Sequence, residues 1–141
     1  MCDSDNVVNN TGIKNPVQHF EETLLCNEKN DGKYAYVLFK ASWCGHCHKY
    51  LPEFLKYREL CKQGTRDNMI MVVVDCDTAK ELCQEYGISG FPITLIFKID
   101  REFRNKLKSA SSDMKRNLAI DSIEGNNLQK LKSAMKKYSN L

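Results

Sequence analysis

Two short apolar runs, separated by a longer amphipathic segment, most constrain the fold of this chain. Residues 36–39 read Tyr-Val-Leu-Phe, and residues 69–74 read Met-Ile-Met-Val-Val-Val. Short runs this apolar are typical of strands that are covered on both faces. The segment between them repeats apolar side chains every three or four positions, which indicates a helix. The sequence therefore predicts a βαβ unit in an α/β domain, with a mixed sheet and helices on both faces.

The rest of the chain adds elements on both sides of this unit. We expect, in chain order, a short edge strand at 7–8, a helix from Pro16, a short helix after Asp77 or Thr78, strands at 93–99 and 118–123, and a last helix along Leu128, Leu131, Met135 and Tyr138. Asp77 or Thr78 is expected to cap the short helix. Pro52 should kink the long helix. Residues 100–115 are polar and basic and are expected to form a long irregular connection.

The length and composition fit one domain. The chain has 141 residues, of which 42% are hydrophobic and 28% charged, enough for one packed core. We divide it into a polar segment, 1–14, and a domain, 15–141. No apolar run approaches the roughly 20 residues of a membrane helix. The polar start resembles no secretory signal, and the end resembles no retention tail. We therefore expect a cytoplasmic protein with no membrane partner.

Seven cysteines are many for this length, and the number is odd. Their scatter shows no disulfide framework, which favours a reducing compartment. Cys61, Cys76 and Cys83 occupy positions where free Cys packs as a small hydrophobe. Cys2 and Cys26 are harder to place, and an exposed thiol that forms an intermolecular disulfide is one option for each.

Cys44 and Cys47 stand where the first apolar strand runs into the helix. The spacing alone is weak, because chance yields it in roughly one such sequence in three. The position is informative, because unpaired N–H groups at a helix start stabilise the thiolate that attacks disulfides. Cys47 follows one turn later and can resolve a mixed disulfide. Gly45 leaves the sulfur accessible, and Trp43 offers an apolar platform. We predict a redox-active dithiol.

The run Trp43-Cys44-Gly45-His46-Cys47 resembles the active site of the protein disulfide isomerase branch of the thioredoxin superfamily. Further matches are Pro52 inside the helix, the end of the central strand at 73–75, the segment Tyr86-Gly87-Ile88-Ser89-Gly90-Phe91-Pro92, and Ile123-Glu124-Gly125 before the last helix. The resemblance covers residues 15–138. It implies a thioredoxin fold and a thiol–disulfide oxidoreductase, a reductase or isomerase, that acts on protein clients without a cofactor.

The resemblance also implies roles for residues near the dithiol. In the family, the proline that corresponds to Pro92 follows a cis peptide bond and faces the dithiol. We therefore expect a cis Phe91–Pro92 bond. The backbone of Phe91 would then pair with a client peptide like an added strand, beside Trp43. His46 should favour the Cys44 thiolate and make the pair more oxidising. We predict a potential between about −270 mV and about −180 mV, the values of thioredoxin and the isomerase.

Two positions depart from the family pattern. Leu38 stands where the family has a buried acid that helps move the proton of the second cysteine. Lys40 replaces the usual aromatic residue, and either substitutes in part for the acid or points to solvent. The missing acid keeps a second hypothesis open, a thioredoxin-like module that binds clients around Trp43 and Phe91-Pro92 with slow turnover.

Other ligands receive less support. Cys44, Cys47, His46 and His48 offer metal-ligand types but lack a second close pair, so neither a zinc site nor an iron–sulfur cluster between two chains is expected. His48 and His19 are read as surface residues.

Residues 101–141 carry 10 Lys and Arg against 4 Asp and Glu, but no nucleic-acid motif accompanies this charge. We expect a monomer with protein clients, recycled by a reductase or by glutathione.

Overall fold

The structure, a computed structural model, describes residues 7–8, 16–62, 68–111 and 114–138. Its strands are β1 (Val7–Val8), β2 (Tyr34–Lys40), β3 (Met69–Asp75), β4 (Ile93–Lys98) and β5 (Asp121–Glu124). Its helices are α1 (Pro16–Leu25), α2 (Gly45–Lys62), α3 (Lys80–Glu85), α4 (Arg101–Ser109) and α5 (Leu128–Tyr138), with a 3-10 helix, η1 (Lys115–Leu118). No described helix combines the length and apolar composition that crossing a membrane requires.

One mixed sheet organises these elements in the order β1-β3-β2-β4-β5. β2 runs parallel to β3 over its whole length, from Tyr34 opposite Met69 to Lys40 opposite Asp75. β4 runs antiparallel to β2 and to β5. The predicted βαβ unit and mixed sheet are confirmed, and so is the short edge strand, which pairs in parallel with β3.

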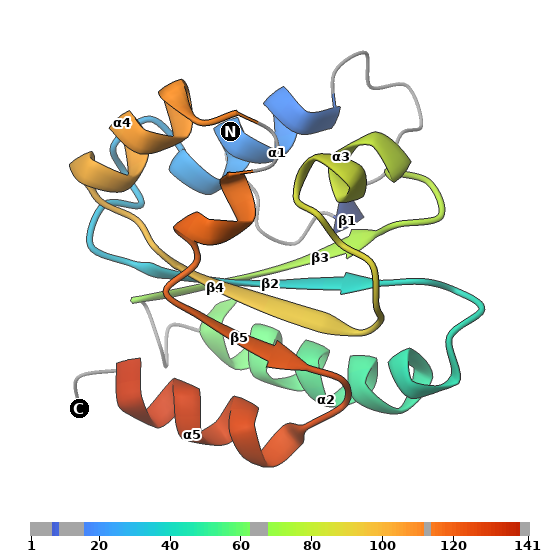
Figure 1. The fold of residues 1–141 in the computed structure, drawn as a ribbon. Helices are drawn as coiled ribbons and strands as arrows, with labels where there is room; N and C mark the ends of the chain where they lie inside the picture. Colours follow the sequence, from blue (N-terminus) through green and yellow to red (C-terminus); the bar gives the residue numbers. More distant parts are fainter. Residues whose placement is uncertain (1–6, 9–15, 63–67, 112–113, 139–141) are drawn as a thin grey trace.

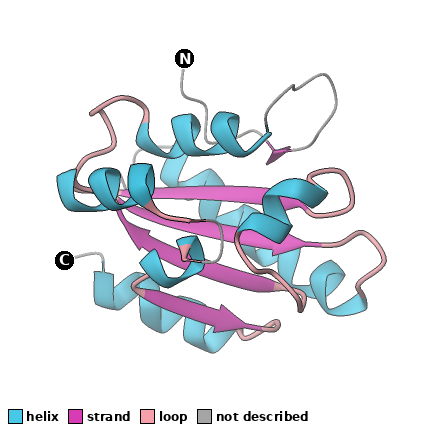
Figure 2. Cartoon of the chain, turned by 45° about the horizontal axis from the view of Figure 1, so that its top comes forward, coloured by secondary structure: helices cyan, strands magenta, loops and turns pink. Residues whose placement is uncertain are grey.

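Helices cover both faces of the sheet, with α1, α3 and α4 on one face and α2 and α5 on the other (Figure 1). Figure 2 shows the same layers with the sheet between them. Alternate residues of β2 serve the two faces, because successive side chains of a strand point in opposite directions. Val37 and Phe39 pack under α1 and α3, whereas Tyr36 and Leu38 pack against α2.

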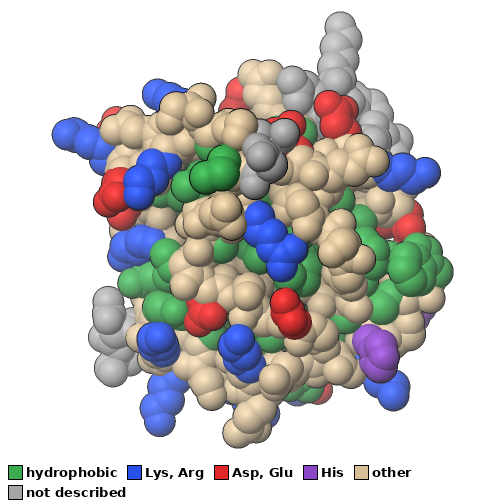
Figure 3. Space-filling view, viewed as in Figure 1, with side chains coloured by type: hydrophobic (Ala, Val, Ile, Leu, Met, Phe, Trp, Pro, Cys, Tyr) green, Lys and Arg blue, Asp and Glu red, His purple; other side chains and the backbone are tan. Residues whose placement is uncertain are grey.

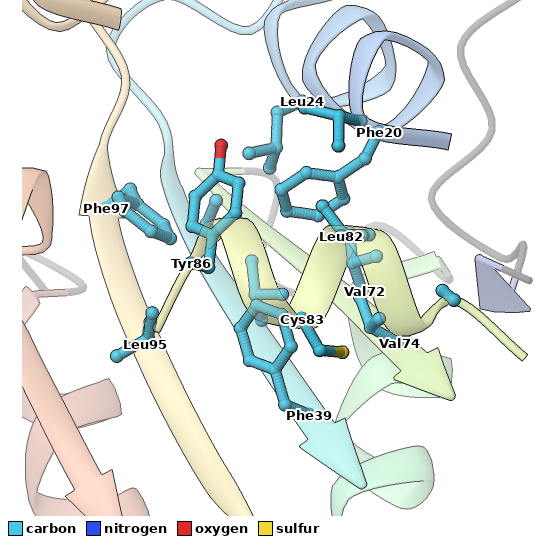
Figure 4. Packing of buried hydrophobic residues seen from close by; sticks show 14 of the residues in the cluster. Phe20, Leu24, Phe39, Val72, Val74, Leu82, Cys83, Tyr86, Leu95 and Phe97 are labelled. Carbon is cyan, nitrogen blue, oxygen red and sulfur yellow. The ribbon is translucent and has the colours of Figure 1, made fainter. Parts of the chain in front are cut away.

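The core under α1 and α3 is aromatic. Phe20 of α1 meets Tyr86 edge to face, with ring centroids 5.5 Å apart, and Phe39 of β2 lies 6.3 Å from the same ring. Figure 4 shows these rings together with Leu24, Leu82 and Val72. Tyr86 follows α3 directly, so this packing fixes the start of the loop that leads to Pro92.

Residues 100–115 differ from the expected irregular connection, because α4 occupies most of them. The Asp100 side chain caps this helix by accepting a 2.8 Å hydrogen bond from the Phe103 N–H. Phe103 and Leu107, four residues apart, are buried against the first face of the sheet. Two apolar side chains and a cap are thus enough for a helix that packs against a preformed surface.

Three other expectations have mixed outcomes. The last strand begins at Asp121 rather than at 118, because η1 takes up Lys115–Leu118. The apolar stripe of the last helix is confirmed by α5, in which Leu131 and Met135 are buried. The polar segment 1–14, apart from 7–8, lies outside the described residues. The division at residue 15 stays a prediction.

Candidate active site

The two cysteines of the predicted dithiol lie at the junction of β2 and α2. Cys44 directly precedes α2, and Cys47 lies in its first turn. Both are free thiols, and both are largely buried, Cys44 at 6% and Cys47 at 2% exposure. β2 delivers the chain to this point because its central residues are held between β3 and β4. The structure therefore brings both sulfurs to the carboxyl end of a central strand.

Backbone groups on two sides hold the sulfur of Cys44. It accepts a hydrogen bond from the Cys47 N–H at 3.4 Å, and its thiol lies 3.6 Å from the carbonyl oxygen of Phe91. Phe91 belongs to the loop before β4, 47 residues further along the chain. The fold thus places the Phe91 backbone directly beside the first cysteine.

Trp43 and Phe91 form an apolar shelf beside Cys44. The two rings meet edge to face, with centroids 5.6 Å apart, and Trp43 is 72% exposed. A large apolar side chain this exposed is typical of a contact surface. In Figure 3 hydrophobic side chains gather at the right edge, on the side where β2 leads into α2 in Figure 1.

The loop before β4 supplies the remaining wall of the site. The Phe91–Pro92 bond is cis, as expected. Phe91 packs against the small buried cluster of Ala41, Cys44 and Cys47. On the other side of this loop is a cavity of about 290 Å³, lined by residues 89–93 together with Arg116, Glu124 and Gly125.

The residues between the two cysteines are open to solvent. A Cβ atom at Gly45 would meet no atom within 4 Å, so the approach to the sulfurs is unobstructed on this side. His46 is exposed at the second position of α2. His48 is exposed as predicted, but its ring Nε2 lies 2.6 Å from the carbonyl oxygen of Ser42. His19 is half-buried rather than on the open surface.

The two thiols differ in their surroundings. Burial raises the pKa of Cys47 to about 11, and the neighbouring Cys44 thiol acts in the same direction. The backbone of Ala41 and the ammonium of Lys40 act in the opposite direction on this pKa. Cys47 is therefore a protonated thiol at neutral pH, which suits a residue that waits to resolve a mixed disulfide.

Asp77 has a different place from the helix cap expected for it. The N-cap residue of α3 is Ala79, and no side chain caps this helix. The Asp77 carboxylate instead accepts hydrogen bonds from the N–H, at 2.6 Å, and the hydroxyl of Ser42. These bonds, with a smaller contribution from Trp43, lower the pKa of Asp77. The loop after β3 thus anchors the residues directly before Cys44, because both loops leave parallel strands at the same edge.

A comparison with protein families decides the assignment of the fold. The thioredoxin family model matches residues 13–121, most of the chain. The chain belongs to the thioredoxin family. Among solved structures, reduced Schistosoma mansoni thioredoxin is 26% identical and superposes with a TM-score of 0.59, over 84% of this chain and 90% of that one. The predicted thioredoxin fold is therefore confirmed.

Among curated proteins, this thioredoxin domain matches members with isomerase names. A probable protein disulfide-isomerase ER-60 of Schistosoma mansoni is 44% identical over 64 residues, which are 45% of this chain and 13% of that protein. Protein disulfide isomerase-like 2-1 of Oryza sativa is 35% identical over 82 residues, 58% of this chain and 22% of that protein. The chain therefore spans a small part of the length of the curated relatives it matches.

The departures from the thioredoxin pattern have clear structural consequences. Leu38 is fully buried in the apolar cluster under α2, so no carboxyl group stands at this position. Lys40 does not point into solvent. Its ammonium lies 3.4 Å from the Asp75 carboxylate, and its side chain is 17% exposed. Strand pairing explains the contact, since Lys40 and Asp75 are register partners on β2 and β3.

Two cysteines expected to be free form a disulfide instead. Cys76 and Cys83 are bonded, with their Cα atoms 5.9 Å apart. Both are buried as predicted, but the prediction that they pack as free thiols was wrong. Cys76 leaves β3 and Cys83 lies in α3, so the bond ties the loop that carries Asp77 to its helix. Cys26 is also disulfide-bonded and is buried, whereas Cys2 and the side chain of Cys61 lie outside the described residues.

The search for metal ligands gives no candidate in the described part of this thioredoxin domain. No group of three or more His, Cys, Asp or Glu side chains in 7–8, 16–62, 68–111 and 114–138 is arranged to hold a metal ion. The basic side chains of the C-terminal third are spread among acidic and uncharged ones on the face shown in Figure 3.

Proposed function

We propose that this chain is a protein thiol–disulfide oxidoreductase in which Cys44 is the nucleophile and Cys47 the resolving cysteine. The observation that carries the proposal is the contact of the Cys44 sulfur with the Phe91 carbonyl, beneath the exposed ring of Trp43. A client disulfide bound along Phe91-Pro92 would meet this sulfur. The isomerase names of the relatives agree with this chemistry.

The reaction consists of two thiol–disulfide exchanges. The Cys44 thiolate attacks one sulfur of a client disulfide, the client S–S bond breaks, and the other client sulfur leaves as a thiolate. Cys47 then loses its proton and attacks the sulfur of Cys44, which releases the second client sulfur. The client has gained two electrons, and Cys44 and Cys47 have formed a disulfide. Oxidation of a client is the same sequence in reverse.

Each neighbouring residue has a proposed part in these steps. The Phe91 backbone pairs with the client, Pro92 directs this backbone toward Cys44, and the Trp43 ring supports the apolar side chains of the client. Gly45 keeps the approach open. His46, exposed between the two cysteines, favours the reduced form of the pair.

The compartment determines the direction of the reaction. In a reducing compartment such as the cytosol, the pair would act as a reductase, recharged by a reductase or by glutathione. In an oxidising lumen it would act as an oxidase or isomerase. The cytoplasmic location stays a prediction, and the Cys76–Cys83 disulfide favours the oxidising alternative, because structural disulfides persist there. Action as a monomer is part of the same proposal.

The alternative is a thioredoxin-like module that binds clients with little turnover. Leu38 supports it, because a buried leucine cannot take the proton of Cys47 as an acid would. The shelf of Trp43 and Phe91 would then be the functional feature. Both functions use the same surface, so turnover separates them.

Insulin reduction by the full chain, with dithiothreitol as the electron donor, tests the proposal. We expect the wild-type chain to precipitate the insulin B chain well before the reagent alone does. The Cys44→Ser variant should lose this activity. Reduced Cys47→Ser, freed of dithiothreitol and then mixed with insulin, should accumulate a mixed disulfide at Cys44. If wild type and Cys44→Ser are equally inert, the binding module is the better explanation.

A further inference from the structure

A small cavity next to Cys47 has a lysine in its wall. Its volume is about 170 Å³, and Lys40 and Cys47 line it together with His48, Leu51 and Pro52. Cys47 is the cysteine that must lose a proton before it can act. The side chains of Lys40 and Cys47 therefore border the same surface cavity.

Lys40 is fixed in this place by the sheet. Its ammonium pairs with Asp75 at 3.4 Å, its backbone oxygen accepts a 2.8 Å hydrogen bond from the Cys76 N–H, and its side chain is 17% exposed. The other oxygen of Asp75 accepts the Asp77 N–H at 3.0 Å. A lysine held by this network cannot follow the usual preference of its side chain for open solvent.

The strand geometry puts Lys40 on the side where the thiol lies. Residues two apart on a strand share a face, and Leu38 packs against α2. Lys40 thus projects from the same face of β2, one step closer to the active-site loop. Lys40 and Cys47 thus line the same cavity from β2 and α2, whereas position 38 carries no carboxyl group.

We propose that Lys40 is a positioning residue that stabilises the thiolate of Cys47 while it displaces the client, and that Asp75 holds the ammonium in place. The inference rests on the proposed function. The Cys47 proton leaves to solvent through the cavity, the Cys44–Cys47 bond forms as the bond from Cys44 to the client breaks, and the departing client sulfur takes the electron pair and then a proton from solvent.

The electrostatics agree with this role. The titratable groups that border the site are Cys44 directly before α2, His48 on α2, Lys40 on β2, and Asp75 and Asp77 at the end of β3. Burial raises the pKa of Cys47, and Lys40 is the cation that lowers it. An ammonium that opposes a burial penalty speeds the formation of the thiolate at neutral pH.

The test measures Cys47 itself rather than turnover. In a Cys44→Ser background, the rate at which iodoacetamide alkylates Cys47 is followed from pH 7 to 11 by mass spectrometry of the peptide that contains it. Adding Lys40→Met should lower the rate at pH 8 by roughly three- to tenfold and move the midpoint to higher pH. Lys40→Arg, which keeps the charge, should restore most of the rate.

Lys49→Met is the matched control. It removes the same charge two residues from Cys47, but from an exposed position of α2. Its rate should stay within about twofold of the parent, because an exposed charge is screened by solvent. Equal rates for Lys40→Met and Lys49→Met would overturn the proposal.

A second variant removes the same charge but keeps a polar side chain. Lys40→Gln can still donate a hydrogen bond to Asp75, and it should slow the alkylation of Cys47 as Lys40→Met does, whereas a merely structural role of the pair predicts an unchanged rate. This variant keeps the test decisive if Lys40→Met fails to fold. The alkylation of Cys47 is measured without a client. A chain that is inactive in the insulin assay would therefore reject the proposed function, while the alkylation rates would still test the effect of Lys40 on Cys47.

Discussion

At the scale of single residues, the proposed reaction requires Cys47 to lose its proton before a client is released. Burial raises its pKa to about 11, and below this pH its thiolate fraction rises about tenfold per pH unit. We expect release of a fluorescent thiol from a preformed mixed disulfide at Cys44 to accelerate nearly tenfold per unit between pH 7 and 9. Stopped-flow fluorescence measures this step, with Cys47→Ser as the control that should not release the thiol. A rate that does not change with pH would contradict the assignment.

A second prediction at this scale concerns Asp77 and the active-site loop. Asp77 holds Ser42 by two hydrogen bonds and lies near Trp43. Asp77→Ala should free the residues before Cys44, and the fluorescence anisotropy of Trp43, the single tryptophan of the chain, should fall. Thr78→Ala, at an exposed neighbouring position, serves as the control. Unchanged anisotropy in Asp77→Ala would show that the loop is held by other contacts.

At the scale of elements, Lys115 joins η1 to two helices on the first face of the sheet. Its ammonium lies 2.7 Å from Glu21 of α1 and pairs with Glu85 of α3. Glu21 also accepts the hydroxyl of the buried Tyr86, which it helps to keep protonated. Burial lowers the pKa of Lys115, but the two carboxylates outweigh it, and the net pKa is raised. This ion triad ties the segment between β4 and β5 to the domain.

Removing the cation of this triad should be costly. Lys115→Met leaves Glu21 and Glu85 facing each other without a counter-ion, and we expect the free energy of unfolding in urea to fall by about 3 kcal/mol. Lys106→Met is the control, because its ion pair with Glu102 on α4 is largely exposed, and it should change stability by less than about 1 kcal/mol. Similar losses in the two variants would contradict a special role for the triad.

The elements that the sequence did not reveal have identifiable causes. The apolar runs at 36–39 and 69–74 predicted β2, β3 and their parallel pairing, because burial on both faces leaves a plain pattern. α4 was missed because only Phe103 and Leu107 of its residues are buried. Their spacing of four, together with the capping Asp100, was the available signal.

At the scale of the whole molecule, contacts that depend on strand register escaped prediction. Lys40 meets Asp75 because the two residues are register partners at the ends of β2 and β3. In the chain, 34 residues lie between Lys40 and Asp75. The bonds from Asp77 to Ser42 have the same origin. Cys76 and Cys83 become partners only once α3 folds back on the end of β3. The dithiol and the cis Pro92 were predictable because a resemblance to a family supplied the tertiary context.

The equilibrium between the reduced and oxidised forms of Cys44 and Cys47 decides whether the two cysteines are a redox-active pair. The chain is titrated in glutathione redox buffers and read by the fluorescence of Trp43, and the cysteine pair is identified by peptide mass spectrometry. We predict one two-electron transition between about −270 mV and about −180 mV, in which these two cysteines form a disulfide. The absence of a Cys44–Cys47 disulfide at every redox potential of the buffer, or a potential of the pair below the thioredoxin value, would contradict this prediction.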